Sequence, residues 1–171
     1  MVTKQNYLLR PLKTGDAAGM LEWMQDNITT RYLRIDGRAY TIDDVLRFIE
    51  EAKNEASNIH RAIVDRNDAY LGTVSLKNID REKREAEYAI ALHPKAQGSG
   101  AAYDATEEIL TIAFQTMGLE RIYLNVMEEN QRAIRFYEKF GFVYRKKTVA
   151  NIKNEFKTLF WYDINPSHSL K

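Results

Sequence analysis

The segment from His93 to Thr106, with the sequence HPKAQGSGAAYDAT, constrains the fold of this chain more than any other. It joins the end of a predicted strand to the start of a predicted helix through two closely spaced glycines, Gly98 and Gly100. The first turn of a helix has backbone N–H groups without partners inside the helix, and its dipole adds about half a positive charge there. Glycines remove the side chains that would keep an anion from those donors. The junction therefore suits a phosphate group, although an ordinary turn can have the same glycine spacing.

The composition fits one compact domain, which we expect to span residues 1–171 as a single unit with its own core. The 25 Lys and Arg nearly balance the 24 Asp and Glu, so we expect neither nucleic acid nor an anionic membrane surface as a partner. The chain has no Cys, which excludes disulfides, thiolate metal ligands and a cysteine nucleophile, and we expect no metal. No stretch reaches the roughly 18 apolar residues of a membrane span, and no secretory signal is evident. We therefore expect a soluble cytoplasmic protein.

Hydrophobic periodicity, helix caps and turn signals predict the order of the elements. We expect helices at 16–24, capped by Asp16, at 41–55, at 101–117 and at 130–140. We expect strands at 7–11, 59–65, 70–79, 86–92, 122–126, 142–147 and 156–164. The strands between 59 and 92 form an antiparallel meander, whereas helices and strands alternate after it. This order predicts a mixed sheet flanked by helices.

Two segments together resemble the GCN5-related N-acetyltransferase (GNAT) family. The first, QGSGAA at 97–102, fits that family's pyrophosphate loop, Q/R-x-x-G-x-G/A, at Gln97, Gly100 and Ala102. The second, NQRAIRFYEKFGF at 130–142, fits the family's helix N-x-x-A-x-x-F-Y-x-K-x-G-F at every defined position. The two segments have the family's order and spacing, and the resemblance covers nearly the whole chain. It is similar above all to the branches that acetylate ribosomal proteins and amino sugars.

The resemblance implies an α/β fold with a mixed, α+β type of sheet. The sheet would have about seven strands, mostly antiparallel, with one splayed parallel pair and about four flanking helices. It also implies an enzyme that moves an acetyl group from acetyl-CoA, its cosubstrate, directly to a primary amine. The acceptor would be a small molecule, such as an amino sugar or a nucleotide-linked sugar, or a protein N-terminus. The enzyme would be a monomer or a homodimer.

In this family acetyl-CoA lies between the two strands that separate, with its pantetheine amides along an exposed strand edge. The resemblance places the diphosphate at the glycine loop and the pantetheine along the strand that ends at Leu92. The residues expected to bind the coenzyme are Ile90, Ala91, Leu92, Gln97, Gly98, Ser99, Gly100, Ala101, Ala102, Asn130, Ala133 and Tyr137. Asn130 is equally suited to be a plain N-cap, and Tyr137 to be a core tyrosine with a satisfied hydroxyl.

Two side chains are candidates for the catalytic steps. Tyr137 lies two helical turns after Asn130 on the same face, where its hydroxyl can protonate a leaving thiolate. An alkylammonium is almost wholly protonated at pH 7, so the reaction also needs a base. The resemblance assigns this role to Glu87, directly or through water. Glu85 shares a strand face with Glu87, and His60 is a possible substitute base.

The acceptor is expected at the link between the first two helices, residues 29–40, which contains three arginines and two tyrosines. Arginines suit phosphate or carboxylate groups, so we expect Arg31, Tyr32, Arg34 and also Glu85 to contact the acceptor. A polyamine is less expected, because a polycation needs an acidic pocket and this link is basic. An exposed charged loop without a ligand is the alternative.

Two other classes of function remain open. A binding module of the same fold would sense acyl-CoA without chemistry. A nucleotide-binding protein could use the glycine loop as a phosphate cradle, but the chain lacks the pattern G-x-x-x-x-G-K-[ST].

Overall fold

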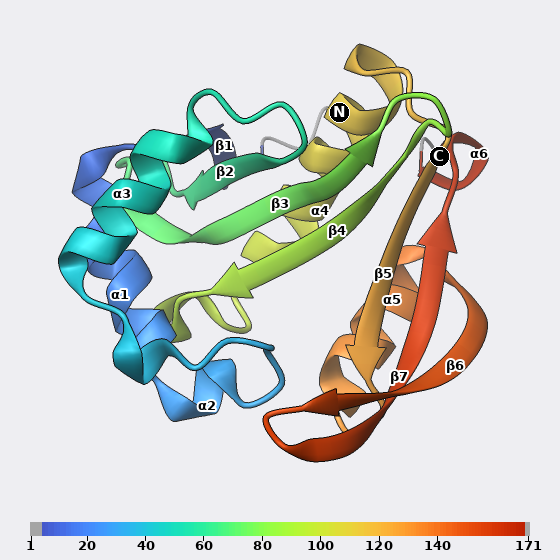
Figure 1. The fold of residues 1–171 in the computed structure, drawn as a ribbon. Coiled ribbons are helices and arrows are strands. Elements are labelled where there is room, and N and C mark those ends of the chain that lie inside the picture. Colours follow the sequence, from blue (N-terminus) through green and yellow to red (C-terminus); the bar gives the residue numbers. More distant parts are fainter. Residues whose placement is uncertain (1–4, 170–171) are drawn as a thin grey trace.

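The computed structural model describes residues 5–169, in which seven strands form one sheet with the order β1-β2-β3-β4-β5-β7-β6 (Figure 1). The strands are β1 (Leu8–Pro11), β2 (Ile59–Val64), β3 (Tyr70–Asp80), β4 (Glu85–Leu92), β5 (Arg121–Met127), β6 (Val143–Ile152) and β7 (Glu155–Ile164). The longer helices are α1 (Ala17–Gln25), α3 (Ile42–Ala52), α4 (Ala101–Thr111) and α5 (Gln131–Phe140), and the shorter ones are α2 (Asn27–Thr30) and α6 (Pro166–Ser169). The predicted α/β class and the order of its strands and longer helices are confirmed.

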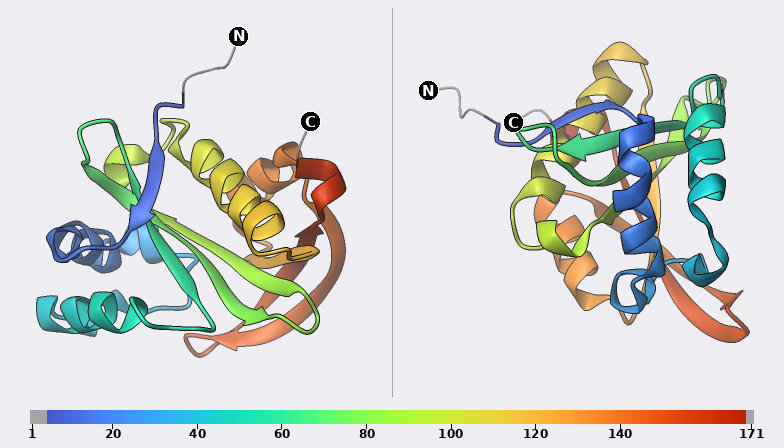
Figure 2. Two further views of the ribbon diagram at one scale, coloured as in Figure 1. Left: turned by 90° about the horizontal axis from the view of Figure 1, so that it is seen from above. Right: turned by 90° about the vertical axis from the view of Figure 1, so that its left-hand side faces the viewer.

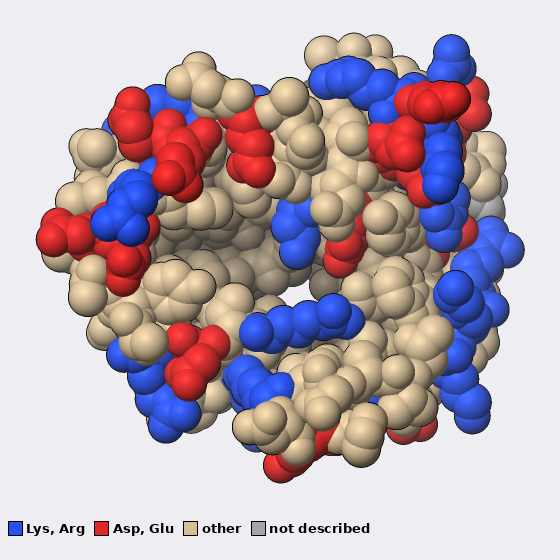
Figure 3. Space-filling view, in the orientation of Figure 1, with Lys and Arg blue, Asp and Glu red and all other residues tan. Residues whose placement is uncertain are grey.

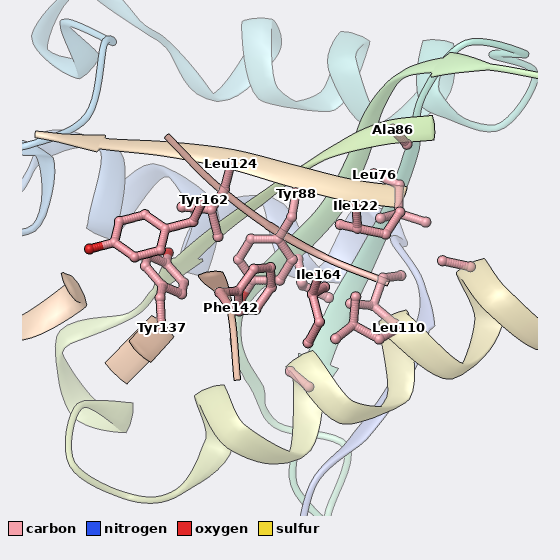
Figure 4. Packing of buried hydrophobic residues seen from close by; sticks show 14 of the residues in the cluster. Leu76, Ala86, Tyr88, Leu110, Ile122, Leu124, Tyr137, Phe142, Tyr162 and Ile164 are labelled. Carbon is pink, nitrogen blue, oxygen red and sulfur yellow. The ribbon is translucent and has the colours of Figure 1, made fainter. Parts of the chain in front are cut away.

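The helices cover the sheet in two layers, with α1 and α3 on one face and α4 and α5 on the other (Figure 2). Successive residues of β2 point to opposite faces, as in any strand. Ile63 therefore joins the cluster beneath α4, while Ala62 and Val64 join the cluster beneath α1 and α3. Figure 4 shows the larger cluster, in which Leu110 of α4 faces the apolar side chains of the sheet.

The parallel strands β4 and β5 separate after a short contact. They pair only where Glu85, Ala86 and Glu87 face Arg121, Ile122 and Tyr123. On its other side β4 stays paired with β3 as far as Leu92, which faces Gly72. The edge of β4 toward β5 thus has no strand partner from residue 88 onward, and Figure 1 shows the two strands diverging. This confirms the splayed parallel pair that the resemblance implies.

Some boundaries differ from the expected ones. Asp16 is not a side-chain cap of α1: a turn of 3-10 helix, Thr14–Asp16, precedes the helix, and the buried carboxylate instead accepts hydrogen bonds from Arg10 at 2.8 Å. Helix α3 begins at its predicted cap, Thr41, but ends at Ala52. Helix α4 passes into a π-helical turn, Ile112–Thr116.

The last two strands form a longer hairpin than expected, because β6 continues to Ile152. Its turn contains Lys153 and Asn154, both with positive φ, at 53° and 65°. Lysine is an unusual residue for such a turn, which normally carries Asn, Asp or Gly, so the sequence gives a weak turn signal here. No helix among residues 5–169 is long and apolar enough to cross a membrane.

Candidate active site

A cavity of about 730 Å³ lies between the segment 28–48, the strands β3, β4 and β5, and helix α5. Figure 3 shows this hollow in the middle of the molecule, with Lys and Arg side chains reaching over it. Most residues predicted for the site line the cavity, namely Arg31, Tyr32, Arg34, Glu87, Ile90, Ala91, Leu92, Gln97, Asn130, Ala133 and Tyr137. Those that do not line it are Glu85 and residues 98–102. The structure therefore brings the predicted acceptor and coenzyme residues together around one space.

The glycine loop lies beside this cavity and has the backbone shape that its glycines permit. Gly98 has a φ of +75°, and Gly100, with a φ of +90°, is the left-handed N-cap of α4. Within residues 5–169, four backbone N–H groups of the loop and first helical turn donate no hydrogen bond: Gly98, Gly100, Ala102 and Tyr103. The Ala101 N–H differs, because it donates to the Ser99 hydroxyl at 3.2 Å. The loop therefore has free N–H donors for an anion. The N–H of Ala101, which was also expected to bind the coenzyme, already donates to Ser99.

Arg132 is a residue of the site that the sequence analysis missed. One of its guanidinium nitrogens donates to the Gln97 side-chain oxygen at 3.4 Å, and the other lies close to Gly98. Arg132 stands at an undefined position of the helix motif, so the motif gives it no role. Its charge becomes informative only once the start of α5 is known to lie against the glycine loop.

Asn130 begins α5 and has both properties considered from the sequence. Its side-chain oxygen accepts a hydrogen bond from the Ala133 N–H at 3.3 Å, which makes it an N-cap. Its side chain also lines the cavity, and its amide NH₂ has no partner among the described residues. The cap therefore holds Asn130 in place with its donors free for a ligand.

Tyr137 lies on the inner face of α5, where its ring packs edge-on against the rings of Tyr88 and Phe142 (Figure 4). Only 9% of the residue is exposed. Its hydroxyl makes no hydrogen bond within residues 5–169, although the side chain lines the cavity. Burial raises the pKa of the Tyr137 phenol well above its ordinary value of 10.0, so the group holds its proton at neutral pH. The hydroxyl of Tyr137 is thus protonated and without a partner within residues 5–169, so this residue is not a core tyrosine with a satisfied hydroxyl.

Glu87 is the carboxylate of β4 that faces the cavity. Its two oxygens accept hydrogen bonds from the side-chain amides of Asn125, at 3.2 Å, and Asn78, at 3.0 Å. Asn125 in turn accepts a hydrogen bond from Arg34 at 3.1 Å. The sequence analysis missed both asparagines, because each comes from a different strand and nothing in the local spacing links it to Glu87. Together they fix the position of the carboxylate without neutralising it.

Glu85 is not brought to the cavity, contrary to the expectation that it contacts the acceptor. It lies at the start of β4, opposite Arg121 of β5, and pairs with that guanidinium at 2.9 Å. Arg121 also pairs with Asp163 of β7 at 2.9 Å. Period-two alternation puts Glu85 and Glu87 on one face, but the cavity opens only beyond the three paired positions of β4 and β5. Glu85 helps to hold that short parallel contact.

The segment 29–40 forms the opposite wall with the predicted residues Arg31, Tyr32 and Arg34. The Arg31 guanidinium lies over the Tyr32 ring at 4.8 Å and donates to its hydroxyl at 2.9 Å. Arg34 reaches Asn125 across the cavity. The segment is therefore part of the site rather than a loop directed only to solvent.

His60 also lines the cavity and stays a second candidate for the base. Its Nδ1 lies 2.7 Å from the hydroxyl of Ser75 on the neighbouring strand. Burial lowers the pKa of His60 below its ordinary value of 6.5, which the nearby Glu55 carboxylate partly offsets. The ring is thus neutral at pH 7 and able to accept a proton.

The arrangement of fold and site matches a known family. A model described as an acetyltransferase (GNAT) domain matches residues 6–143. This chain belongs to the GNAT family. The family predicted from the two sequence motifs is confirmed, and the glycine loop, β4, β5 and the whole of α5 fall within the matched region.

Curated relatives include two spermidine N(1)-acetyltransferases. The GNAT domain described here is 33% identical to that of Escherichia coli K12 over 100 residues, 56% of this chain and 54% of the relative. It is 38% identical to that of Vibrio cholerae over 73 residues, 43% of this chain and 42% of the relative. The chain thus spans about half the length of these curated relatives in the matches. A longer match, 26% identical over 78% of this chain and 77% of the relative, is the uncharacterized N-acetyltransferase p20 of Bacillus licheniformis.

Solved structures show the same fold over the full length. The spermidine N-acetyltransferase from Vibrio cholerae in complex with CoA and spermine superimposes with a TM-score of 0.88. The alignment covers 97% of this chain and 99% of that one, at 24% sequence identity. At this identity the likeness establishes the fold of the GNAT domain.

Proposed function

We propose that the chain is an acetyl-CoA-dependent N-acetyltransferase that transfers the acetyl group directly to a primary amine. The observation that carries this proposal is the free hydroxyl of Tyr137 in a cavity that opens where β4 loses its strand partner. An unpaired strand edge is a liability in most proteins, and here it adjoins a cavity large enough for a ligand. A ligand with amide groups can take the place of the missing strand.

The residues present fit coenzyme A. The free N–H groups at the start of α4 and the guanidinium of Arg132 suit its diphosphate. The exposed edge of β4 from Ile90 to Leu92 and the free amide of Asn130 suit its pantetheine. Acetyl-CoA would supply the reactive thioester.

The chain's own groups then serve the transfer. Glu87, directly or through water, takes the proton from the acceptor ammonium, so that the amine nitrogen can attack the thioester carbon. The N–H groups of β4 near Ile90 and Leu92 stabilise the negative charge that develops on the carbonyl oxygen. When the carbon–sulfur bond breaks, Tyr137 gives its proton to the departing sulfur. The nitrogen releases its second proton to solvent, and Tyr137 regains one from solvent. The C–N bond that forms leaves an acetylated amine and free CoA.

For the acceptor we propose the primary amine of a small molecule, such as an amino sugar or a nucleotide-linked sugar, or of a protein N-terminus. A polyamine is the second candidate, favoured by the 33% and 38% identity to spermidine N(1)-acetyltransferases. The basic segment 29–40 supports the first candidate, because it repels a polycation.

The proposal is tested by two measurements on the purified protein. We expect acetyl-CoA to raise the melting temperature, and at least one amine from a panel of amino sugars, nucleotide-linked sugars, peptides and polyamines to release free thiol from it. A thermal shift without thiol release from any amine would favour a module that senses acyl-CoA without chemistry. The absence of both results would contradict the proposed function.

A further inference from the structure

The cavity is lined by four cationic side chains that have no carboxylate partner within residues 5–169: Arg31, Arg34, Lys77 and Arg132. The three arginines donate hydrogen bonds to neutral groups, namely the Tyr32 hydroxyl, the Asn125 amide and the Gln97 amide. Elsewhere the chain pairs many of its cations, as at Arg10, Arg121 and Lys157. The cavity therefore gathers positive charge that no direct ion pair within residues 5–169 neutralises.

Two carboxylates line the same cavity, and neither faces these cations as an ion pair. Asp44 caps α3 by accepting from the backbone N–H of Thr41 at 2.8 Å, and it lies 3.6 Å from Arg47, outside the cavity lining. Glu87 is held by the amides of Asn78 and Asn125. Four cations against two carboxylates leave the cavity with an excess of positive charge.

The four cations divide between two places. Arg132 lies at the glycine loop, where the diphosphate of the coenzyme would account for it. Arg31 and Arg34 lie on the opposite wall, and Lys77 lies beside Glu87 on the neighbouring strand. Arg34 and Glu87 contact opposite ends of one amide, that of Asn125. Only the Asn125 side chain thus separates Arg34, which can bind an anionic group of a ligand, from Glu87, which can bind its amine.

We infer that the acceptor is a small amine that also carries an anionic group, a phosphate or a carboxylate, held by Arg34 and Arg31 while its amine lies at Glu87. This inference rests on the proposed function and narrows its substrate class. The planar guanidinium binds phosphate and carboxylate through paired hydrogen bonds. Both arginines are exposed, so they stay solvated and available without a ligand. A polycation such as spermidine would meet like charge on this wall.

The test compares matched acceptors by thiol release from acetyl-CoA. The phosphate pair is glucosamine 6-phosphate and glucosamine, the carboxylate pair is serine and serinamide, and spermidine is the fifth acceptor. We expect the charged member of at least one pair to show a kcat/KM at least tenfold above both its neutral parent and spermidine. A neutral amine or spermidine used as well as both charged members would overturn the inference and leave the proposed transfer intact. No release from any amine, together with no thermal shift by acetyl-CoA, would contradict the proposed transfer itself.

Variants locate the anionic group. Arg34→Gln should lower kcat/KM for the preferred charged acceptor at least tenfold more than kcat/KM for its neutral parent, which changes only through the lost contact with Asn125. Arg31→Gln should act in the same direction. Arg38→Gln is the matched control, because Arg38 lies in the same segment but pairs with Asp36 and does not line this cavity. Equal losses for charged and neutral acceptors in Arg34→Gln would contradict the assigned contact.

Discussion

At the scale of single residues, Tyr137 combines a structural and a chemical role. Its ring is part of the core beneath the sheet, and its hydroxyl is left without a partner at the cavity. We expect Tyr137→Phe to lower kcat by about 10²- to 10⁴-fold, because the departing sulfur loses its proton donor. The shift in melting temperature on adding acetyl-CoA should persist, since the ring remains. Thiol-release kinetics and thermal denaturation check the two parts.

Tyr162→Phe is the matched control for this prediction. Tyr162 is also buried, but its hydroxyl donates to Glu138 at 2.7 Å and the residue does not line the cavity. Losing this hydrogen bond in Tyr162→Phe should lower the free energy of unfolding by about 1 kcal/mol and leave kcat unchanged. Equal kcat values for Tyr137→Phe and Tyr162→Phe would contradict a role of Tyr137 as proton donor.

A second residue-scale prediction concerns the carboxylate of the cavity. Glu87→Gln keeps the shape of the side chain, and its one oxygen can still accept a hydrogen bond from one of the two asparagine amides. The glutamine cannot take up a proton, so kcat should fall by about 10²-fold or more. Glu85→Gln, on the same strand, should leave kcat unchanged and weaken the contact with Arg121. Rates with a saturating amine decide between them. Unchanged activity in Glu87→Gln would shift the role of base to His60 or to water.

The residues that sequence motifs mark are those whose role is local. Asn130 and Tyr137 lie seven positions apart on one helix, so their common face follows from helical periodicity. Asn78, Asn125 and Arg132 act through contacts between segments distant in sequence. The contacts of the two asparagines depend on the register of β3, β4 and β5, and that of Arg132 on the packing of α5 against the glycine loop, which spacing along the chain does not encode.

At the scale of elements, the start of α4 depends on a left-handed residue. Gly100→Ala places a Cβ in that conformation at +90°, which should cost about 1–2 kcal/mol of unfolding free energy. It should also weaken acetyl-CoA binding, because the free N–H groups around it move. Calorimetry of acetyl-CoA binding and thermal denaturation measure the two effects.

Gly118→Ala provides the control, since Gly118 has a φ of +68° with nothing within 4 Å of the added Cβ and lies outside the cavity. Its stability should fall similarly while the affinity for acetyl-CoA stays the same. Equal affinities in both variants would show that the loop does not hold the diphosphate.

The pairing of β2 with β3 predicts a dependence of stability on pH. His60 belongs to β2, faces Ser75 of β3 and has a lowered pKa, and Glu55, Lys77 and Arg61 are the charged groups near it. As the pH falls below about 6.5, the unfolded chain takes up a proton that the folded ring resists, so unfolding becomes more favourable. Between about pH 7.5 and about pH 5.5, a range that brackets the histidine titration, the melting temperature of the unchanged protein should fall. We expect the melting temperature of His60→Gln to fall less over the same range. Parallel melting curves against pH would contradict this explanation.

Element boundaries follow from sequence where a local signal fixes them. The capping box of Thr41 and Asp44 marks the start of α3 correctly. The sequence does not predict the end of β6, because Lys153 is a weak turn signal. It also does not predict the role of Asp16, because the carboxylate of Asp16 pairs with Arg10 instead of capping α1. The first difference thus comes from a weak local turn signal, and the second from a contact between side chains.

At the scale of the whole molecule, the separation of β4 from β5 divides the sheet into two halves joined at three paired positions. No spacing in the sequence predicts this separation, and it was expected only from the resemblance to the family. Backbone amides of β4 beyond residue 87 that point toward β5 have no strand partner. We expect acetyl-CoA to slow hydrogen exchange in residues 88–92, because its amides would pair with this edge. Exchange in residues 61–64 of β2, paired with β1 on one side and β3 on the other, should change little. Equal exchange of residues 88–92 with and without acetyl-CoA would place the ligand elsewhere.

The splayed strands also have a consequence for turnover under the proposed reaction. The glycine loop and the open edge of β4 would grip the diphosphate and the pantetheine, which survive the transfer unchanged. Free CoA would therefore keep most of the binding contacts of acetyl-CoA and compete with it for the gap between β4 and β5. The rate should follow the ratio of acetylated to free coenzyme rather than the amount of either alone.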